Sequence, residues 1–233
     1  MPELALVAAL EREIRPLVRR WRVEEREYAG RRFRFFESER CVAVCGGIGP
    51  EAARRATEAI ISLYRPAVVE SVGFAGALES GLRVGQVIEV GQVVDARDNS
   101  RTDTGSGSET LITFPSIAGP EQKAKLAAAY QAQVVDMEAA AVAKAAEARR
   151  IRFAAVKVIS DEADFSLPVM DRFIGAEGEF HSARFALYAA VRPWLWGTVL
   201  RLTRNSNLAA KHLSLYLEKR IERAQHASVG TGS

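Results

Sequence analysis

The stretch that decides the fold is Val134–Asp164, VVDMEAAAVAKAAEARRIRFAAVKVISDEAD. A short apolar run at Val134 leads into the alanine-rich segment Met137–Ala148, whose composition favours a helix. The mostly apolar segment Phe153–Ile159 follows, as expected of a strand buried on both faces. Strand, helix and strand in this order predict a mainly parallel sheet with a helix packed on it.

The same alternation extends outward along the chain. Pro50, at the position that proline favours, opens a helix with apolar residues at helical spacing. The predicted strands are Leu4–Ala9, two runs within Arg32–Cys45, Ala67–Val72, Val84–Val94 and Thr110–Phe114. A charged, helix-favouring stretch begins at Glu11 and precedes the runs within Arg32–Cys45, and two further helices are predicted at Glu51–Tyr64 and Glu121–Tyr130. The segment Asp98–Glu109 is predicted to be a loop. We predict a three-layer α/β fold, with a mainly parallel or mixed central sheet flanked by helices.

The sequence predicts one domain. Residues 1–180 form it, and residues 181–233 add a C-terminal helical extension with disorder from about Gln225. Among the 233 residues, 48% are apolar and 26% charged, which is ordinary for a soluble globular protein. Neither a secretory signal nor a membrane span is apparent, so we expect a cytoplasmic protein.

The two cysteines do not form a metal or disulfide motif. Cys41 and Cys45 lie on one predicted strand, where their Cα atoms would be ~13 Å apart at ~3.3 Å per residue. A disulfide needs less than ~7 Å. With no histidine or further cysteine at ligand spacing, we interpret both as buried small hydrophobic residues and expect neither metal nor organic cofactor.

Three acidic residues follow strand exits, where ligands bind in such folds. Glu13 follows the first strand, Glu138 opens the alanine-rich helix, and Asp161 follows the last clear strand. Taken singly, each has an ordinary explanation: a solvated helix residue, a partner of the helix macrodipole and a helix cap. Their arrangement together indicates a site.

Five segments resemble the family of purine nucleoside phosphorylases and methylthioadenosine/S-adenosylhomocysteine nucleosidases. They occur in the family's order and span most of residues 3–165: Ala9–Glu13, Gly47–Gly49, Gly73–Gly76, Val135–Ala139 and Ile159–Asp164. The Asp-Met-Glu-Ala helix start, followed some twenty residues later by Ser-Asp, is a specific signal. The glycine turns alone are weak.

The resemblance implies an enzyme that cleaves the N-glycosidic bond of a purine (adenine) nucleoside. Asp161, next to Ser160, matches the acid that protonates the departing purine, and burial would keep it protonated near neutral pH. Glu138 matches the residue that binds the ribose hydroxyls through charge-assisted hydrogen bonds. Met137 would pack on the sugar. Glu13 matches the residue that activates water in nucleosidases.

Further binding residues follow from the same resemblance. Ala75 and Gly76 match the turn beside ribose and base, where small side chains let the backbone approach the ligand. Ile48 matches an apolar residue of the 5′-substituent pocket. The segment between Val94 and Val134 is shorter than usual, which predicts a more open pocket that suits a bulky 5′ group.

The nucleophile stays open between water and phosphate. Phosphorylases of the family hold phosphate with an arginine and a serine near the second glycine turn. Here Phe74 stands in place of a hydroxyl and the cation is missing. Arg31, Arg32 or Arg34 are candidate replacements, although a solvated strand face explains them too. Water is favoured, with inorganic phosphate as the alternative co-substrate.

The C-terminal extension has two interpretations. It contains Trp194, Leu195, Trp196, Val199, Leu200 and Leu202, interleaved with basic residues, and from His181 onward eight basic residues stand against two acidic ones. These residues either pack on the domain or a second subunit, or lie on anionic lipid at the inner membrane surface. The lipid interpretation resembles the hopanoid-associated branch, whose members release adenine from adenosylhopane.

Partners are predicted on the same basis. The resemblance implies a homo-oligomer, with a dimer favoured on the nucleosidase branch. The net charge of +3 and the lack of a recognised motif argue against nucleic acid. The alternative of a different class is a catalytically silent nucleoside- or lipid-binding protein on the same scaffold.

Overall fold

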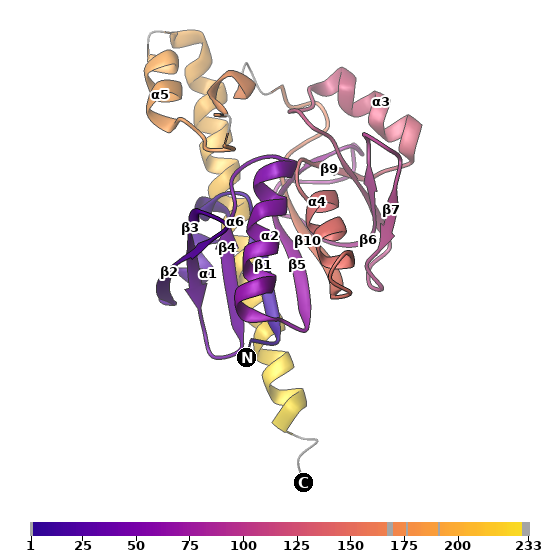
Figure 1. Cartoon of the computed structure of the whole chain (residues 1–233). Coiled ribbons are helices and arrows are strands. Elements are labelled where there is room, and N and C mark those ends of the chain that lie inside the picture. The colour runs from indigo at the N-terminus through magenta and orange to yellow at the C-terminus, as the bar shows by residue number, and fades with distance from the viewer. Residues whose placement is uncertain (1, 167–169, 176, 191, 230–233) are drawn as a thin grey trace.

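A mixed sheet organises the molecule. The computed structural model describes residues 2–166, 170–175, 177–190 and 192–229. Ten strands pair in the order β10-β6-β8-β9-β5-β1-β4-β3-β2, and β7 pairs with β6 (Figure 1). The strands are β1 (Leu4–Ala8), β2 (Arg22–Tyr28), β3 (Arg31–Glu37), β4 (Cys41–Cys45), β5 (Val68–Ala77), β6 (Val87–Asp95), β7 (Arg101–Asp103), β8 (Glu109–Thr113), β9 (Val134–Asp136) and β10 (Arg152–Asp161). Because β10 pairs with β5 as well as β6, five of the strands close into a ring.

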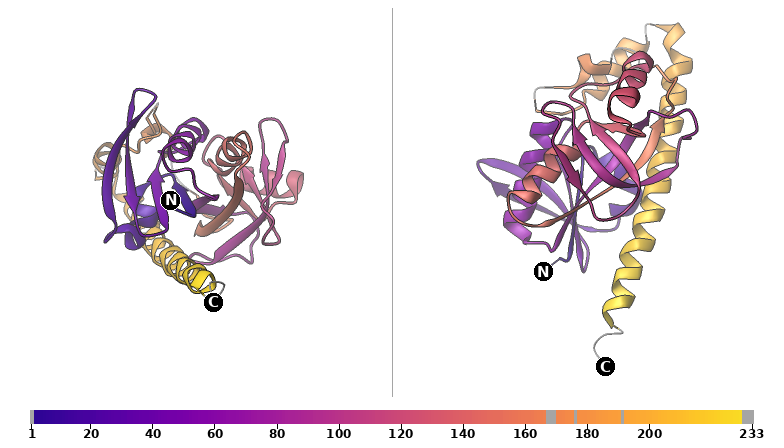
Figure 2. Two further views of the ribbon diagram at one scale, coloured as in Figure 1. Left: turned by 60° about the horizontal axis from the view of Figure 1, so that its bottom comes forward. Right: turned by 90° about the vertical axis from the view of Figure 1, so that its right-hand side faces the viewer.

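Helices cover both faces of this sheet (Figures 1 and 2). The helices are α1 (Glu11–Val18), α2 (Pro50–Tyr64), α3 (Pro120–Tyr130), α4 (Ala139–Glu147), α5 (Ser182–Ala190) and α6 (Trp196–Val229), with short 3₁₀ turns at Met170–Phe173 and Pro193–Leu195. Helices α2 and α4 pack on one face, and α1 and α6 pack on the other. The predicted three-layer α/β fold with a C-terminal helix is confirmed.

The central strands explain the apolar runs in the sequence. Strand β1 lies between β4 and β5 and is parallel to both, so that Leu6 is paired with Ala43 and Glu70. Strand β10 is parallel to β5 from Arg152 onward. Strands with parallel neighbours and helices on both faces bury every position, which requires continuous apolar segments rather than alternation.

Three local predictions were wrong. The segment Asp98–Glu109 was predicted as a loop, but it contains β7, which pairs with β6. The charged segment Arg22–Tyr28 was included in a helix-favouring stretch, but it forms β2, the edge strand of a hairpin with β3. Its side chains are exposed or half-buried, so it lacks the apolar signal of a core strand. The segment Gly73–Gly76 was read as the turn that ends a strand. Strand β5 instead continues through it to Ala77.

The cysteines match the prediction in part, because Cys45 is half-buried rather than buried. Both are free, and both lie on β4, where Cys41 is fully buried and Cys45 half-buried. Their partners in the parallel register are Leu4 and Ala8 on β1. Burial raises the pKa of both thiols, so they stay uncharged and pack as small hydrophobic groups.

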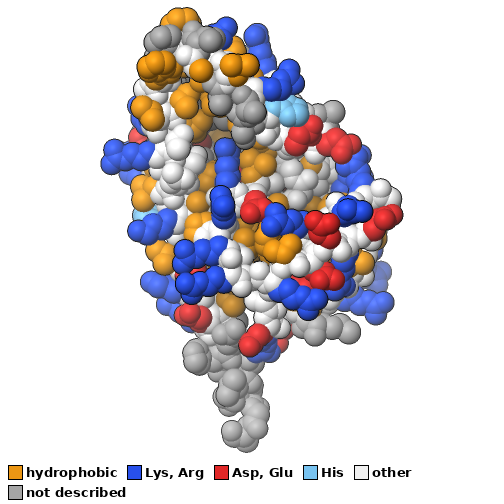
Figure 3. All heavy atoms as spheres, turned by 90° about the vertical axis from the view of Figure 1, so that its left-hand side faces the viewer, with side chains coloured by type: hydrophobic (Ala, Val, Ile, Leu, Met, Phe, Trp, Pro, Cys, Tyr) orange, Lys and Arg blue, Asp and Glu red, His pale blue; other side chains and the backbone are white. Residues whose placement is uncertain are grey.

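The C-terminal extension packs on the domain along much of its length. Helix α6 runs the length of the molecule (Figure 2) and buries Ala209, Leu213 and Leu217 against α1 and the sheet. Its first turns and α5 expose hydrophobic side chains at one end of the molecule (Figure 3). The proposed boundary at residue 180 stays a prediction. The predicted disorder from Gln225 also stays a prediction, and residues 230–233 of that segment lie outside the described residues.

Glu70 connects the sheet to α6, but its carboxyl group loses its hydration there. Its side chain on β5 is fully buried, and Arg220 Nη1 on α6 lies 2.8 Å from Oε1, although neither carboxyl oxygen meets hydrogen-bond geometry. Burial raises the pKa of Glu70 to about 7, while Arg220 opposes the shift. The folded chain therefore binds the proton more tightly than the unfolded chain, whose carboxyl has an ordinary pKa.

We predict that Glu70 makes the protein less stable as the pH rises. Between pH 4.5 and 7 the folded state holds more protons than the unfolded state, so the free energy of unfolding falls with rising pH. The Glu70 contribution is on the order of 3 kcal/mol. Urea unfolding at pH 5 and pH 8 should show a loss that is smaller in Glu70→Gln than in the wild type by the Glu70 contribution, because Glu13 and Glu138 still contribute in both.

The matched control for this prediction is Glu147→Gln, which changes an exposed glutamate at the end of α4. It should keep the wild-type dependence on pH. A Glu70→Gln variant that loses as much stability between pH 5 and pH 8 as the wild type would contradict the assignment.

Candidate functional site

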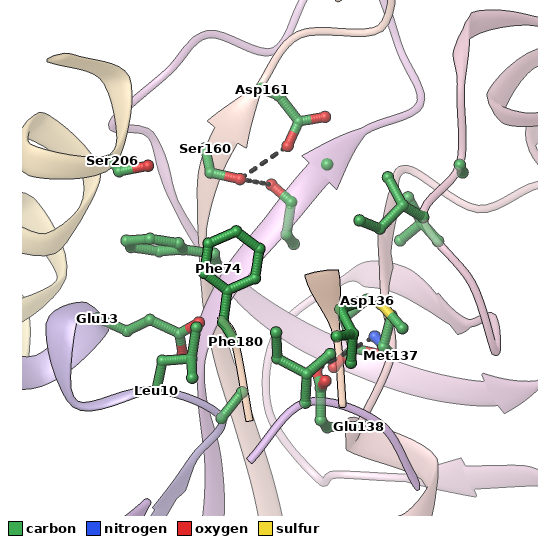
Figure 4. Close-up of a pocket in the computed structure, with 18 of the residues that line it drawn as sticks. Leu10, Glu13, Phe74, Asp136, Met137, Glu138, Ser160, Asp161, Phe180 and Ser206 are labelled. Atoms are coloured by element: carbon green, nitrogen blue, oxygen red, sulfur yellow. Dashed lines mark hydrogen bonds between the residues drawn. The ribbon is translucent and has the colours of Figure 1, made fainter. Parts of the chain in front are cut away.

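One cavity contains all nine residues that the sequence predicted for the site. It encloses about 880 Å³, part of it open to solvent. The nine residues are Glu13, Ile48, Phe74, Ala75, Gly76, Met137, Glu138, Ser160 and Asp161. They come from the first turn of α1, the loop before α2, the end of β5, the β9–α4 junction and the end of β10. In Figure 4, Asp161 and Ser160 lie at one end of the cavity, and Glu13 and Glu138 lie toward the other.

Asp161 is held by groups on both of its carboxyl oxygens. Ser160 Oγ donates a 2.7 Å hydrogen bond to Oδ1. On the other side, Lys123 Nζ donates to Oδ2. Lys123 belongs to α3, is almost fully buried and lines the cavity. The sequence analysis missed it, because a lysine in the first turn of a charged helix looks like a surface residue.

Gly76 lets the backbone of β5 approach this pair. A Cβ atom at Gly76 would lie 2.9 Å from Asp161 Oδ2 and 3.1 Å from Lys123 Cε. Both distances are shorter than ordinary van der Waals contact. A residue without a side chain is therefore required where β5 passes beneath Asp161, as the resemblance implied.

Glu138 points its carboxyl group into the cavity from the N-cap position of α4. The backbone N–H of Gly49 donates to Oε1 at 2.7 Å, and that of Met137 donates to Oε2 at 3.2 Å. Burial, with the charge of Asp136, raises the pKa of Glu138 to about 8, while Lys157 and the Gly49 N–H lower it. These contacts orient a carboxyl group whose outer lone pairs can accept bonds from a ligand.

Lys157 lies behind Glu138 and balances the carboxyl groups. Its Nζ on β10 is 2.9 Å from Asp136 Oδ2 and 3.0 Å from Ser71 Oγ. Asp136 also accepts hydrogen bonds from Thr113 Oγ1, at 2.7 Å, and from the first backbone N–H of α4. The side chain of Asp136 thus anchors the start of α4, which fixes the position of Glu138.

Glu13 occupies the space left by a glycine. It is buried in the first turn of α1, and a Cβ atom on Gly73 would lie 2.4 Å from its Oε2. Gly73 has φ = 140°, a value that L side chains rarely adopt. Burial raises the pKa of Glu13 to about 7, against the lowering effects of Lys157 and Arg12. Its carboxyl group therefore changes charge close to neutral pH.

The three arginines considered for phosphate binding lie elsewhere. Each contacts a glutamate: Arg31 with Glu177, Arg32 with Glu25 and Arg34 with Glu11. None of them lines the cavity. The arginine that does is Arg12 on α1, whose guanidinium lies 5.3 Å from the centroid of the Phe180 ring. Its neighbour Glu13 was identified from sequence, but Arg12 was not.

The C-terminal part of the chain forms a wall of the cavity that the sequence analysis did not foresee. Ile174, Phe180 and the α6 residues Leu202 and Ser206 line it. The segment is fixed to the loop before α2, because the Ile48 N–H donates a 2.7 Å hydrogen bond to the Gly178 carbonyl. Ser116, Ile117 and Ala118, in the turn before α3, also line the cavity.

Metal-ligating groups do not gather here. Across the described residues there is no cluster of three or more His, Cys, Asp or Glu side chains suited to a metal ion. The cavity instead combines carboxyl groups, the ammonium group of Lys123, the guanidinium group of Arg12 and apolar walls. Such a set can bind a polar ring system, donate and accept protons, and hold an apolar substituent.

The family model described as the phosphorylase superfamily matches residues 3–121 and 116–185. The match covers most of the chain and includes the β-strand ends and the α4 start that build the cavity. The chain therefore belongs to the phosphorylase superfamily and is an enzyme of that class.

Solved structures show the same fold. The apo structure of 5′-methylthioadenosine nucleosidase from Arabidopsis thaliana is 20% identical over 95% of this chain and 96% of that chain, with a TM-score of 0.72. Futalosine hydrolase from Helicobacter pylori is 17% identical over 93% and 98%, with a TM-score of 0.66. A Colwellia psychrerythraea 5′-methylthioadenosine/S-adenosylhomocysteine nucleosidase in complex with adenine is 21% identical over 69% and 84%, with a TM-score of 0.60.

We predict that Gly73→Ala displaces the Glu13 carboxyl group. The new Cβ atom would overlap Oε2 of Glu13. The Glu13 side chain is flexible, so it is expected to move rather than the backbone of β5. Once displaced toward water, the Glu13 carboxyl should titrate well below the pKa of about 7 that burial gives it. A crystal structure and an NMR titration of the glutamate carboxyls would measure both effects.

Gly81→Ala is the control, since nothing lies within 4 Å of a Cβ atom there. This variant should leave Glu13 in place and its titration unchanged. The interpretation fails if Glu13 in Gly73→Ala keeps its position and still titrates near pH 7.

Proposed function

We propose that the chain cleaves the N-glycosidic bond of a purine nucleoside that carries a 5′ substituent. The observation that supports this most directly is the placement of three carboxyl groups, from Asp161, Glu138 and Glu13, around one cavity. Bond cleavage needs an acid at the base, a hydrogen-bond acceptor at the ribose and a base for the nucleophile. Each carboxyl group has surroundings that suit one of these tasks.

Asp161 is proposed as the acid. When the C–N bond breaks, its electrons move onto the purine, and the developing negative charge is removed by proton transfer to a ring nitrogen. The buried carboxyl group of Asp161 lies beside Ser160, at the end of the cavity opposite Glu13 and Glu138. A base bound at that end would have its ribose toward Met137 and Glu138.

Glu138 is proposed to bind the ribose hydroxyl groups. Above its pKa of about 8, Glu138 is a carboxylate, which forms stronger hydrogen bonds to hydroxyl donors than a neutral acceptor does, and below it the neutral carboxyl group can still accept one. The backbone N–H groups of Gly49 and Met137 already hold both of its oxygens. The orientation is therefore set before substrate binds, and little ordering cost remains at that step.

Water is the proposed nucleophile and Glu13 its base. The pKa of Glu13, raised to about 7, lets the carboxylate form accept a proton near neutral pH. A phosphate dianion would need cations. Of those lining the cavity, Lys123 is bonded to Asp161 and the Glu162 carbonyl and Arg12 lies over Phe180, while Arg31, Arg32 and Arg34 are engaged by glutamates outside it. Hydrolysis with Glu13 as base fits these surroundings better than phosphorolysis.

Adenine is the base that the resemblance favours. The related structures include a nucleosidase with bound adenine and a futalosine hydrolase. The apolar wall of Ile48, Phe180 and Leu202 suits an apolar 5′ substituent. The homo-oligomer, with a dimer favoured, and the cytoplasmic location remain part of the proposal.

We predict that base release from a 5′-substituted adenosine needs no phosphate. With 5′-methylthioadenosine as the probe, free adenine and free methylthioribose should form at the same rate with and without inorganic phosphate. Chromatographic separation of the products would show this. Release that requires phosphate and yields a sugar 1-phosphate would establish a phosphorylase and assign the anion to another cation, with Arg12 the nearest choice.

Asp161→Asn provides the control for the acid. It should lower kcat roughly 100-fold or more, the range of acid catalysis, while the substrate still binds. Near-wild-type release by this variant would show that Asp161 is not the acid. Binding by the wild type without any release would support the catalytically silent alternative.

A second candidate function concerns the membrane. Leu187, Trp194, Trp196 and Leu200 are 72%, 73%, 52% and 71% exposed, and they gather at the α5 end of the molecule. The sequence from residue 180 to residue 217 has no Asp or Glu but contains Arg184, Arg192, Arg201, Arg204 and Lys211. Exposed indoles among arginines suit the surface of an anionic bilayer. None of the described helices is long and apolar enough to span one.

Charge favours lipid over a second copy of the chain at this surface. A two-fold interface would bring the patch against itself, so arginine would face arginine with no carboxylate from the same segment. Anionic head groups supply the missing negative charge. Because Leu202 and Ser206 on the same helix line the cavity, a nucleoside with a long apolar 5′ group, as in the hopanoid-associated branch, could be taken up from the bilayer.

We predict that the chain sediments with vesicles containing phosphatidylglycerol and not with phosphatidylcholine alone. Trp194→Ala with Trp196→Ala should weaken vesicle binding roughly tenfold or more, because each indole offers ~150–250 Å² to the interface. Val23→Ala, at an exposed position on β2, is the control and should bind like the wild type. Loss of binding to both vesicle types, with concentration-dependent self-association, would assign the patch to a second copy.

A further inference from the structure

Lys123 has one more hydrogen-bond donor than the protein uses. An ammonium group carries three N–H donors. Two are directed at Asp161 Oδ2 and at the Glu162 carbonyl, the latter at 2.7 Å. Within the part of the chain that the structure describes, no partner is found for the third. The side chain is 2% exposed and lines the cavity, so little of it is accessible to water.

This donor lies at the end of the cavity that the proposed function assigns to the base. Lys123 Nζ would be 3.3 Å from a Cβ atom at Gly76, directly beside Asp161 Oδ2. An acceptor atom of a ring that Asp161 contacts would therefore also lie close to the ammonium. Purine edges carry such acceptors, because N7 is an acceptor in adenine and in guanine.

Burial of this cation has a cost that packing alone does not justify. A lysine with 1% exposure loses its hydration, and an apolar side chain at the same position would avoid that loss. Among the described residues, the compensating contacts are one carboxyl oxygen and one carbonyl, and they use two of the three donors. A ligand acceptor would complete the set.

We propose that Lys123 is a second catalytic residue, which stabilises the negative charge of the departing base next to Asp161. The proposal rests on the proposed function, since it concerns the same bond cleavage. As the C–N bond breaks, its electron pair moves onto the purine and the proton of Asp161 moves to a purine nitrogen. Lys123 keeps its proton. Its charge stabilises the negative charge that develops on the purine before the proton arrives, and then the carboxylate that Asp161 becomes. The sugar carbon gains a bond to the water oxygen, and the proton of that water goes to Glu13.

The test compares two leaving groups on the same sugar. A purine leaves with difficulty unless its charge is neutralised, whereas 4-nitrophenolate is stable as an anion. In Lys123→Met, kcat for the purine nucleoside should fall roughly 100- to 1000-fold, the effect of losing one preorganised donor. KM should change little, because the charge develops only in the transition state. Cleavage of the matching 4-nitrophenyl riboside should fall much less.

Two further variants separate charge and structure. Lys123→Gln keeps a donor without the charge and should fall between the wild type and Lys123→Met. Lys125→Met changes an exposed lysine of the same helix and should leave both substrates unaffected. Equal losses on the two substrates in Lys123→Met would mean that the residue only supports the structure, which would overturn the proposal.

A double variant tests direct contact with the base. If Lys123 acts only by holding Asp161, then Lys123→Met should have no further effect in the Asp161→Asn background. We expect a further loss of at least tenfold on the purine substrate, because the ammonium contacts the base itself. Additional loss supports the proposal and its absence overturns it. A wild-type chain that cleaves neither substrate would overturn the proposed function and this inference together.

Discussion

The ion pair between Lys157 and Asp136 is the constraint on which the site depends. Lys157 lies within β10, almost fully buried, and its charge acts on Asp136, Glu138 and Glu13. Without it, three carboxyl groups would share a region with little water, and each would favour its neutral form. Asp136, on β9, in turn bonds to the start of α4 and to Thr113 on β8, so the pair joins four elements, β8, β9, β10 and α4.

One cation does not neutralise three carboxyl groups. The effect of burial that Lys157 leaves uncompensated is seen in the raised pKa values of Glu13 and Glu138. Burial still raises the pKa of Glu13 to about 7 and that of Glu138 to about 8. A carboxyl group that titrates near neutral pH can exchange a proton with substrate or water, which one held firmly as a carboxylate cannot do. Incomplete compensation at this end of the cavity is therefore what gives the site its acid–base capacity.

The sequence predicted the elements with an apolar core signal and the residues at their ends. Strands β1, β5 and β10 are mostly apolar runs, and their carboxyl ends meet at one edge, which brings Glu13, Phe74 and Asp161 together. Strand β2 gave no such signal, because an exposed edge strand needs no apolar face. Lys123 and Lys157 escaped notice for a related reason. A buried lysine is identified by the carboxylate that it pairs with. The partner of Lys123 is Asp161 and that of Lys157 is Asp136, and each partner lies on another element.

Helix α6 shows why the two interpretations of the C-terminal extension were not true alternatives. Residues two positions apart on a helix lie on nearly opposite faces, since each residue turns the chain by about 100°. Leu200 is accordingly exposed while Leu202 lines the cavity, and Leu213 farther along is buried against the sheet. The same rigid element thus packs on the domain, closes the site and presents an apolar surface. A partner that binds this apolar surface therefore contacts the same helix that forms a wall of the cavity. The surface and the cavity are linked directly through α6.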